Sequence, residues 1–188
     1  GSAGGGAALV VRPDAAIATD RDFAGRIIAT PQLGNTQDVA ARACFKGRGY
    51  VLKERGGNLT ILPLSNPDQL LMFKKKEIDG AWTIEPWVSR LEQEGGGKVF
   101  LEEKTLWPEG KYITTLLVVS RKFMTDHPEQ AAKLVRAHVE MTQKLNAGKA
   151  AAVPVINAEI RKETGSELPS AVIESAMNRV EFKKKKEK

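Results

Sequence analysis

Short, mainly apolar runs alternate with segments of helical periodicity over the first hundred residues. The runs that predict strands are Ala7–Val11, Ile27–Ala29, Asn58–Asn66 with a turn after it, Ala81–Ile84 and Lys98–Leu101. They lack the regular apolar–polar alternation of a strand with one solvated face, so we expect them to be buried on both faces. Strands that alternate with helices are typical of a mostly parallel sheet covered by helices. The pattern from residue 27 to 101 therefore predicts an α/β unit.

The segments between these strands carry helix start and stop signals. The expected helices are a short piece capped by Thr19 or Asp20 and closed at Gly25, Gln37–Lys46, a helix that runs to Lys76, and a helix with Pro86 in its first turn. Proline suits the first turn of a helix because the amide group it lacks has no partner there. Glycines follow several of these segments, as expected at helix ends.

The pattern changes after Leu101. Tyr112–Ser120 is a longer β-prone run and predicts a strand. The expected helices beyond it are 126–148 with Asp126 as its cap, Lys149–Thr164 and Pro169–Val180. His138 falls in the apolar stripe of the first of these helices, so we expect it to be partly buried. Because these helices have no sheet of their own, they must pack on the α/β unit or on chain that is not present here.

Charge and composition disfavour several classes of protein. The chain has 188 residues and a net charge of +6, of which the last six residues, KKKKEK, supply +4 (five lysines and one glutamate). The remaining +2 is ordinary, and such a lysine run is typical of a solvated tail, not of a nucleic-acid site. No apolar run approaches the ~20 residues of a membrane span. The start, GSAGGGAALVV, lacks the features of a signal peptide, so we expect a mature form or a fragment.

Thiol and imidazole chemistry is poorly supported. Cys44 is the only cysteine, which excludes an internal disulfide, and its helical spacing from Ala40 predicts a small core side chain. His127 and His138 are the only histidines, and neither has a suitable partner close in sequence. We therefore expect no catalytic residue, no metal ion and no cofactor.

The stretch ATPQLGNTQD joins a buried strand to a helix. Gly34 leaves the backbone accessible, and Asn35 or Thr36 can cap the helix. The first amide groups of a helix lack partners within it and lie at the positive end of the helix dipole. Such a helix start can hold a sulfonate, phosphate or carboxylate without a basic side chain. A well-capped turn without a ligand is the alternative, and these residues alone leave both interpretations open.

A second strand end, GAWTIEPW, carries a carboxylate. Glu85 stands before Pro86, where it can favour the helix dipole or accept hydrogen bonds from an amine or amide. Trp82 can wall a pocket or belong to the core, whereas Trp87 is expected in the core. Ligands of open α/β sheets bind at the carboxyl ends of strands, so this strand end is a second candidate.

Several motifs together resemble one family. FAGRIIATPQLGNTQD, EIDGAWTIEPW and YITTLLVVS are similar in order and spacing to the solute-binding proteins of ABC importers for aliphatic sulfonates, taurine and nitrate. The resemblance covers nearly the whole chain and implies a type II periplasmic-binding-protein fold, in which two hinged α/β lobes close on a ligand. It implies ligand-binding roles for Gly34, Asn35, Thr36, Gln37, Thr83 and Glu85, and Trp82 is added as a candidate from its place at the strand end.

The same resemblance implies a division of the chain. Residues 1–12 are a glycine-rich lead and the first hinge strand, 13–113 the second lobe, 114–182 the second hinge strand and the C-terminal helices of the first lobe, and 183–188 a basic tail. The early strands and helices of the first lobe are absent, so only one α/β lobe is complete. We therefore expect weak ligand binding by this chain alone and self-association through uncovered apolar faces.

The predicted function is capture of a small anionic organic solute, such as an aliphatic sulfonate, for an ABC importer. It implies a membrane permease as partner, no nucleic acid, and a periplasmic or extracellular membrane-associated location. Two alternatives share the fold: the effector domain of LysR-type regulators and the pyrimidine-precursor synthases of thiamine biosynthesis. The first requires a DNA-binding helix-turn-helix and the second a histidine or cysteine constellation, and the sequence contains neither.

Overall fold

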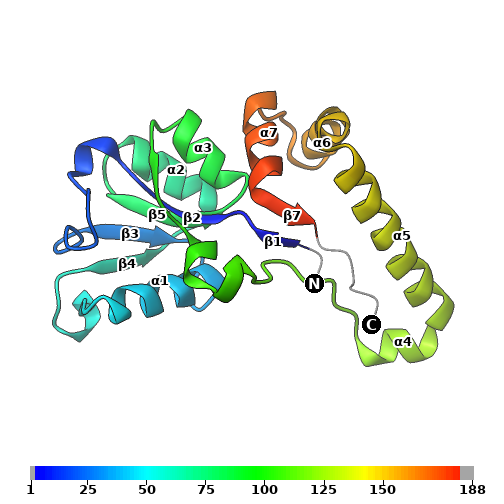
Figure 1. Cartoon of the computed structure of the whole chain (residues 1–188), viewed down its shortest axis with the longest axis horizontal. Coiled ribbons are helices and arrows are strands. Elements are labelled where there is room, and N and C mark those ends of the chain that lie inside the picture. The colour runs from blue at the N-terminus through cyan, green and yellow to red at the C-terminus, as the bar shows by residue number, and fades with distance from the viewer. Residues whose placement is uncertain (1–2, 183–188) are drawn as a thin grey trace. The chain divides into compact units, whose positions relative to one another are not determined.

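The computed structural model of the chain describes residues 3–182 (Figure 1). These residues fall into two compact units, and each is described by itself. Residues 6–111 form the sheet unit, and residues 3–5 with 112–182 form the helical unit. The basic tail predicted for residues 183–188 lies outside the described residues, and the assignment of the two units to the lobes of a hinged protein stays a prediction.

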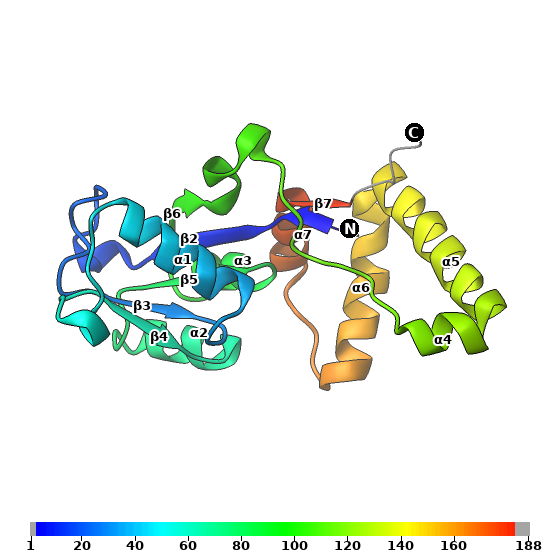
Figure 2. The ribbon, with the colours of Figure 1, turned by 90° about the horizontal axis from the view of Figure 1, so that it is seen from below.

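The sheet unit is a five-stranded sheet with helices on both faces. Its strands are β2 (Ala7–Val11), β3 (Ile27–Thr30), β4 (Thr60–Pro63), β5 (Gly80–Ile84) and β6 (Lys98–Glu102). Its helices are α1 (Thr36–Gly47), α2 (Asn66–Lys74) and α3 (Trp87–Gln93), with 3-10 turns at Pro13–Ala15, Lys53–Arg55, Glu103–Leu106 and Pro108–Gly110. Helix α1 lies on one face, in front of the strands in Figure 2, and α2 and α3 lie on the other. The α/β unit predicted from the apolar runs is thus confirmed, with β4 and α2 shorter than predicted.

The sheet is mixed: the strands predicted to be parallel from their alternation with helices are so, and one further strand runs against them. The strand order is β4–β3–β5–β2–β6, and β3 pairs in parallel with both of its neighbours. Strand β2, however, pairs antiparallel with both β5 and β6. The four strands that alternate with helices therefore share one direction, as crossover connections require, and β2 runs against them. Because β2 enters from the start of the chain and is inserted between two later strands, the alternation pattern carries no information on its direction.

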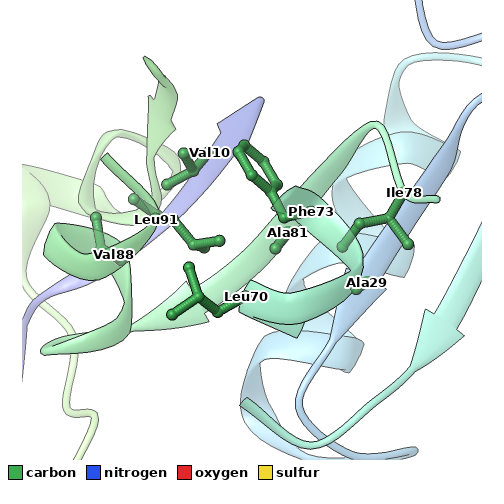
Figure 3. Packing of buried hydrophobic residues seen from close by; sticks show 9 residues of the cluster. Val10, Ala29, Leu70, Phe73, Ile78, Ala81, Val88 and Leu91 are labelled. Atoms are coloured by element: carbon green, nitrogen blue, oxygen red, sulfur yellow. The ribbon is translucent and has the colours of Figure 1, made fainter. Parts of the chain in front are cut away.

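Two apolar layers cover the two faces of the sheet. On one face Val10 of β2 belongs to one cluster with Phe73 of α2 and Leu91 of α3 (Figure 3). On the other face Leu9 belongs to the same layer as Phe45 of α1. Alternate residues of β2 thus enter opposite layers, and the whole strand is buried, as its unbroken apolar run predicts.

The short helix predicted to close at Gly25 is not formed. Residues 20–25 make turns instead, and the carboxylate of Asp22 accepts hydrogen bonds from the amide groups of Ala18 at 3.0 Å and Thr19 at 2.6 Å. Thr19, one of the two predicted caps, accepts from the amide group of Arg21 at 3.3 Å, so the start of the segment is capped although no helix follows. A segment this short gains too few helical hydrogen bonds to offset the ordering of its first turn.

The helical unit combines four helices with a two-stranded antiparallel ribbon. The helices are α4 (Arg121–Asp126), α5 (Pro128–Ala147), α6 (Lys149–Thr164) and α7 (Ser170–Arg179), and the ribbon pairs β1 (Ala3–Gly5) with β7 (Val180–Phe182). Val153 of α6 packs with Ile173 and Met177 of α7 in a small core. The last two predicted helices are confirmed, whereas the ribbon was not predicted because Ala-Gly-Gly has no strand propensity.

The helix predicted over 126–148 is divided in two, and Asp126 is not its cap. Asp126 is the last residue of α4, and α5 begins at Pro128. His127 between them has φ −135° and ψ 56°, because a residue that precedes proline is sterically disfavoured in the helical conformation. Helix α4 is instead capped by Ser120, whose hydroxyl accepts from the amide group of Phe123 at 3.0 Å.

The strand predicted over Tyr112–Ser120 is also wrong. Within this segment only Thr115 forms a β-bridge, with Ala3. A strand needs a neighbour along its length, and β1, which is three residues long, already pairs with β7. The β-prone residues 116–119 therefore remain outside any strand and are exposed, Val118 by 78%. The hinge role predicted for 114–120 stays a prediction.

We expect the exposed apolar residues of the helical unit to drive self-association. Leu116 and Val118 are 63% and 78% exposed, and further large apolar side chains are exposed on α4 and α5. Apolar surface left exposed by a monomer favours association with another copy. Sedimentation velocity should show association that the double variant Leu116→Glu/Val118→Glu reduces. The control is Val155→Glu, on α6 and 65% exposed, which should change it less. A wild-type chain that stays monomeric at high concentration would contradict the prediction.

Candidate ligand-binding site

The carboxyl ends of three strands meet at one edge of the sheet unit. Strands β4 and β5 flank β3 in parallel, so Thr30, Pro63 and Ile84, their last residues, lie at the same edge. Helices α1, α2 and α3 each follow one of these strands and begin near this edge. Three helix N-termini gathered at the carboxyl ends of parallel strands are the usual setting for ligand binding in α/β sheets.

The start of α1 is a tight turn closed by side chains. Asn35 is the cap, and its side-chain oxygen accepts from the amide group of Asp38 at 2.8 Å. Gly34 has φ +75°, and a Cβ atom built on it would meet nothing within 4 Å. Glycine is therefore needed here for its left-handed conformation and not for close approach of the backbone.

Two backbone amide groups at this helix start have no acceptor among residues 3–182. The amide of Gly34 donates to Asp38 and that of Asp38 donates to Asn35, whereas the amides of Thr36 and Gln37 make no hydrogen bond. The Gln37 side chain is buried, and its oxygen accepts from the hydroxyl of Thr36 at 3.0 Å. The four predicted residues thus lie together, with two donors directed along the positive end of the helix.

A buried carboxylate, Asp38, supports the turn, and it is not among the site residues predicted from the sequence. Asp38 accepts hydrogen bonds from Thr30 Oγ1 at 2.9 Å, the Gly34 amide at 3.0 Å and Arg42 Nε at 2.9 Å. Burial alone would raise the pKa of this carboxyl group, but the bonds from Arg42, Gly34 and Thr30 outweigh it, so the pKa of Asp38 is lowered. The position three residues after the Asn35 cap is the signal that could have identified it.

The end of β5 holds the second group of predicted residues. Thr83 is fully buried, and its hydroxyl donates to Asn66 at the start of α2 at 2.9 Å. The carboxylate of Glu85 accepts from both the amide (3.1 Å) and the hydroxyl (3.0 Å) of Ser89, four residues later in α3. Glu85 therefore stabilises the start of α3, which is one of its two predicted roles, and its contact with a ligand stays a prediction.

Trp82 occupies the core and not a pocket wall. Its side chain is fully buried, packs edge-on against Phe45 and donates from Nε1 to Glu103 at 2.8 Å. Glu103 is itself buried and also bonds to the side chain of Trp107. Burial raises the pKa of the Glu103 carboxyl group, although both indole donors oppose that shift. The structure thus favours the core interpretation of Trp82, one of the two left open by the sequence.

The thiol and the side chains that could bind a metal ion do not form a second site within residues 3–182. Cys44 is half-buried against the layer beneath α1, and burial raises the pKa of its thiol. Across residues 3–182, no three or more His, Cys, Asp or Glu side chains are grouped so that they could hold a metal ion. In the same part of the chain, no helix is both long and apolar enough to cross a membrane.

Comparison with known proteins identifies the family. The model of the NMT1-like family matches residues 10–158, which is most of the chain. The chain belongs to the NMT1-like family. A curated relative, the taurine-binding periplasmic protein of Escherichia coli (strain K12), is 27% identical over 140 residues, or 74% of this chain and 41% of the relative. The family resemblance seen in the sequence is thus confirmed.

Solved structures confirm the periplasmic-binding-protein fold. The alkanesulfonate-binding protein SsuA from Xanthomonas axonopodis pv. citri, bound to MOPS, matches 96% of this chain with TM-score 0.72 and 19% identity. SsuA from Escherichia coli matches 95% with TM-score 0.70 and 17% identity, and the desulfurization enzyme DszB matches 92% with TM-score 0.58 and 16% identity. The chain covers 60%, 54% and 61% of these structures, so it spans little more than half of their length.

Proposed function

We propose that this chain is the solute-binding component of an ABC importer and captures a small organic anion such as an aliphatic sulfonate. The observation that carries the proposal is the start of α1, where the amides of Thr36 and Gln37 lack acceptors within residues 3–182 at the carboxyl edge of the sheet. Membership of the NMT1-like family and similarity to the taurine- and alkanesulfonate-binding proteins support it.

In this proposal the mechanism is capture without chemistry. The two amides and the helix dipole stabilise the anionic head, and Asn35 and Gly34 hold the turn in shape. Glu85 lies where it could accept from the amine of a ligand such as taurine. Cys44, the one thiol, is half-buried with a raised pKa, which is unlike an activated nucleophile and supports a role without catalysis.

The same proposal implies a partner and a location. A solute-binding component delivers its ligand to a membrane permease, so the partner is a permease and the location is the periplasm or the outer surface of the membrane. The names of the taurine- and sulfonate-binding relatives support this location. Binding by this chain is expected to be weak, about millimolar or weaker, because the helix start contributes contacts from one side only.

Thr36→Pro tests the role of the Thr36 amide without disturbing the helix. Thr36 is the first residue of α1, where proline is well tolerated, and Asn35 before it is extended (φ −73°, ψ 175°). The variant removes one of the two donors, so we expect affinity for methanesulfonate and taurine to fall about threefold to tenfold relative to Thr36→Ala. The measurement is a titration of amide chemical shifts by NMR.

Thr36→Ala is the matched control because both variants lose the hydroxyl and only proline loses the amide. Wild type should show saturable shifts at Gly34–Gln37. Equal affinities of the proline and alanine variants, or shifts that avoid this segment, would contradict the site.

The second arm of this titration examines Glu85. Glu85→Ala should weaken the binding of taurine, which carries an amine, and leave methanesulfonate unchanged, since that anion has no donor for a carboxylate. Equal loss for both probes would indicate that Glu85 acts only by stabilising the start of α3 through Ser89.

A further inference from the structure

A groove lies on the solvent side of α1, away from the helix start. It has a volume of about 480 Å³ and is bounded by α1 and by the loop 50–55. Val39 from the helix and Val51 from the loop line it, and they are 56% and 51% exposed. Exposed apolar side chains on both walls of one concave surface are the composition expected of a ligand site.

The walls of the groove are held in place. Arg42 of α1 pairs with Asp38 of the same helix and with Glu54 of the loop, so an ion pair joins the two walls. Gly57 closes the loop: its amide donates to Leu52 at 3.0 Å, and a Cβ atom on it would lie 1.8 Å from the Val51 carbonyl oxygen. The groove is therefore formed before any ligand binds, which lowers the ordering cost of binding.

Tyr50 fixes the base of the loop. Its hydroxyl accepts from the Phe23 amide at 3.1 Å and donates to the Asp20 carbonyl oxygen at 2.9 Å. Its ring packs edge-on against Phe23 and Phe45, which belong to the apolar layer beneath α1. The loop is thus anchored to the core of the sheet unit.

The side chains that line the groove carry an excess of positive charge, which favours an anion. Arg42, Lys46 and Arg55 line it against one carboxylate, Glu54, which leaves a local charge of +2. Arg42 is already paired, whereas Lys46 and Arg55 make no ion pair or side-chain hydrogen bond within residues 3–182. Two available cations therefore stand beside two exposed valines.

We propose that this groove binds a small amphipathic organic anion. Its apolar body would lie on Val39 and Val51, and its carboxylate or sulfonate would pair with Lys46 and Arg55. The volume suits a small molecule, since pockets for such ligands hold roughly 300–1,000 Å³ and a peptide needs a longer groove. This site uses residues other than Gly34–Gln37, so it is independent of the proposed solute site.

The test is a titration of the full chain with octanoate, followed through amide chemical shifts. Octanoate combines an eight-carbon chain with a carboxylate, and we expect saturable shifts in residues 39–46 and 50–55. Acetate has the same head without the chain, and 1-octanol has a similar chain without the charge. Each should bind at least tenfold more weakly than octanoate, because acetate lacks the apolar chain and 1-octanol lacks the negative charge.

Charge reversal supplies the second measurement. Lys46→Glu/Arg55→Glu should weaken octanoate binding at least tenfold. The matched control is Lys74→Glu/Lys75→Glu, at the end of α2, which makes the same change in net charge and should leave octanoate binding within twofold. Equal binding by the two double variants would overturn the proposal, and so would octanoate shifts confined to Gly34–Gln37 or to the helical unit. Binding of taurine is measured separately through the shifts of Gly34–Gln37. Failure of the groove proposal can therefore be distinguished from failure of the proposed solute site.

Discussion

Replacing Trp82 by phenylalanine is expected to lower the free energy of unfolding of the sheet unit by about 2 to 4 kcal/mol. Trp82 is fully buried against Phe45, so the smaller ring leaves a cavity. The variant also removes the Nε1 donor from the buried carboxyl group of Glu103. All three tryptophans of the chain lie in the sheet unit, so the fluorescence of the two that remain reports its unfolding in urea.

Trp107→Phe separates the two contributions to this loss. Trp107 is 45% exposed and also bonds to Glu103, so its replacement removes a donor and creates little cavity. We expect a loss of about 1 kcal/mol, the usual contribution of one hydrogen bond. A Trp82→Phe variant that unfolds at the wild-type urea concentration would contradict the buried position of Trp82.

The pH dependence of the Trp82→Phe effect follows from Glu103. The folded-state pKa of Glu103 is raised by burial, so its charged form is disfavoured in the folded protein and stability falls as pH rises through that pKa. The indole donor of Trp82 stabilises the charged form. We therefore expect the loss caused by Trp82→Phe to be larger at pH 7.5 than at pH 4.5, where the carboxyl group is more protonated.

The interior of the sheet unit could be predicted from the sequence because its signals are local. An unbroken apolar run such as Ala7–Val11 identifies a strand buried on both faces, and the start of α1 follows from its capping residues. The direction of β2 could not be predicted, because it depends on where the strand inserts between β5 and β6. The run Tyr112–Ser120 has strand propensity, yet propensity forms a strand only beside a partner.

In the candidate site, too, local features could be predicted from the sequence and contacts between distant residues could not. Gly34–Gln37 adjoin in sequence, so their grouping at one helix start required no tertiary information. The partners of the predicted residues were not foreseen, because they come from elsewhere in the fold: Glu103 lies 21 residues from Trp82, and Asn66 lies 17 from Thr83. Those contacts decide that Trp82 is a core residue and that Thr83 is tied to α2.

Asp38→Asn is expected to lower the free energy of unfolding at pH 7 by about 2 to 3 kcal/mol. The buried carboxylate of Asp38 accepts hydrogen bonds from Thr30, the Gly34 amide and Arg42. An asparagine has the same shape, but its NH2 group replaces one of the two accepting oxygens. The groups that donate to that oxygen would then lose their acceptor. Asp68→Asn is the matched control, since Asp68 occupies the same third position of α2 but is exposed. We expect it to cost less than about 1 kcal/mol.

The stabilising effect of Asp38 should disappear in acid. Its pKa is lowered in the folded protein, so its contribution is present above the unfolded pKa of about 3.9 and is lost as pH falls through the folded value. Urea unfolding of wild type and Asp38→Asn should therefore differ most above pH 5 and converge toward pH 3. A difference that stays constant over this range would show that packing, not the charge of Asp38, stabilises α1. Because Asp38 also accepts from the Gly34 amide, the variant should speed hydrogen exchange at Gly34 in the candidate site, and Asp68→Asn should not.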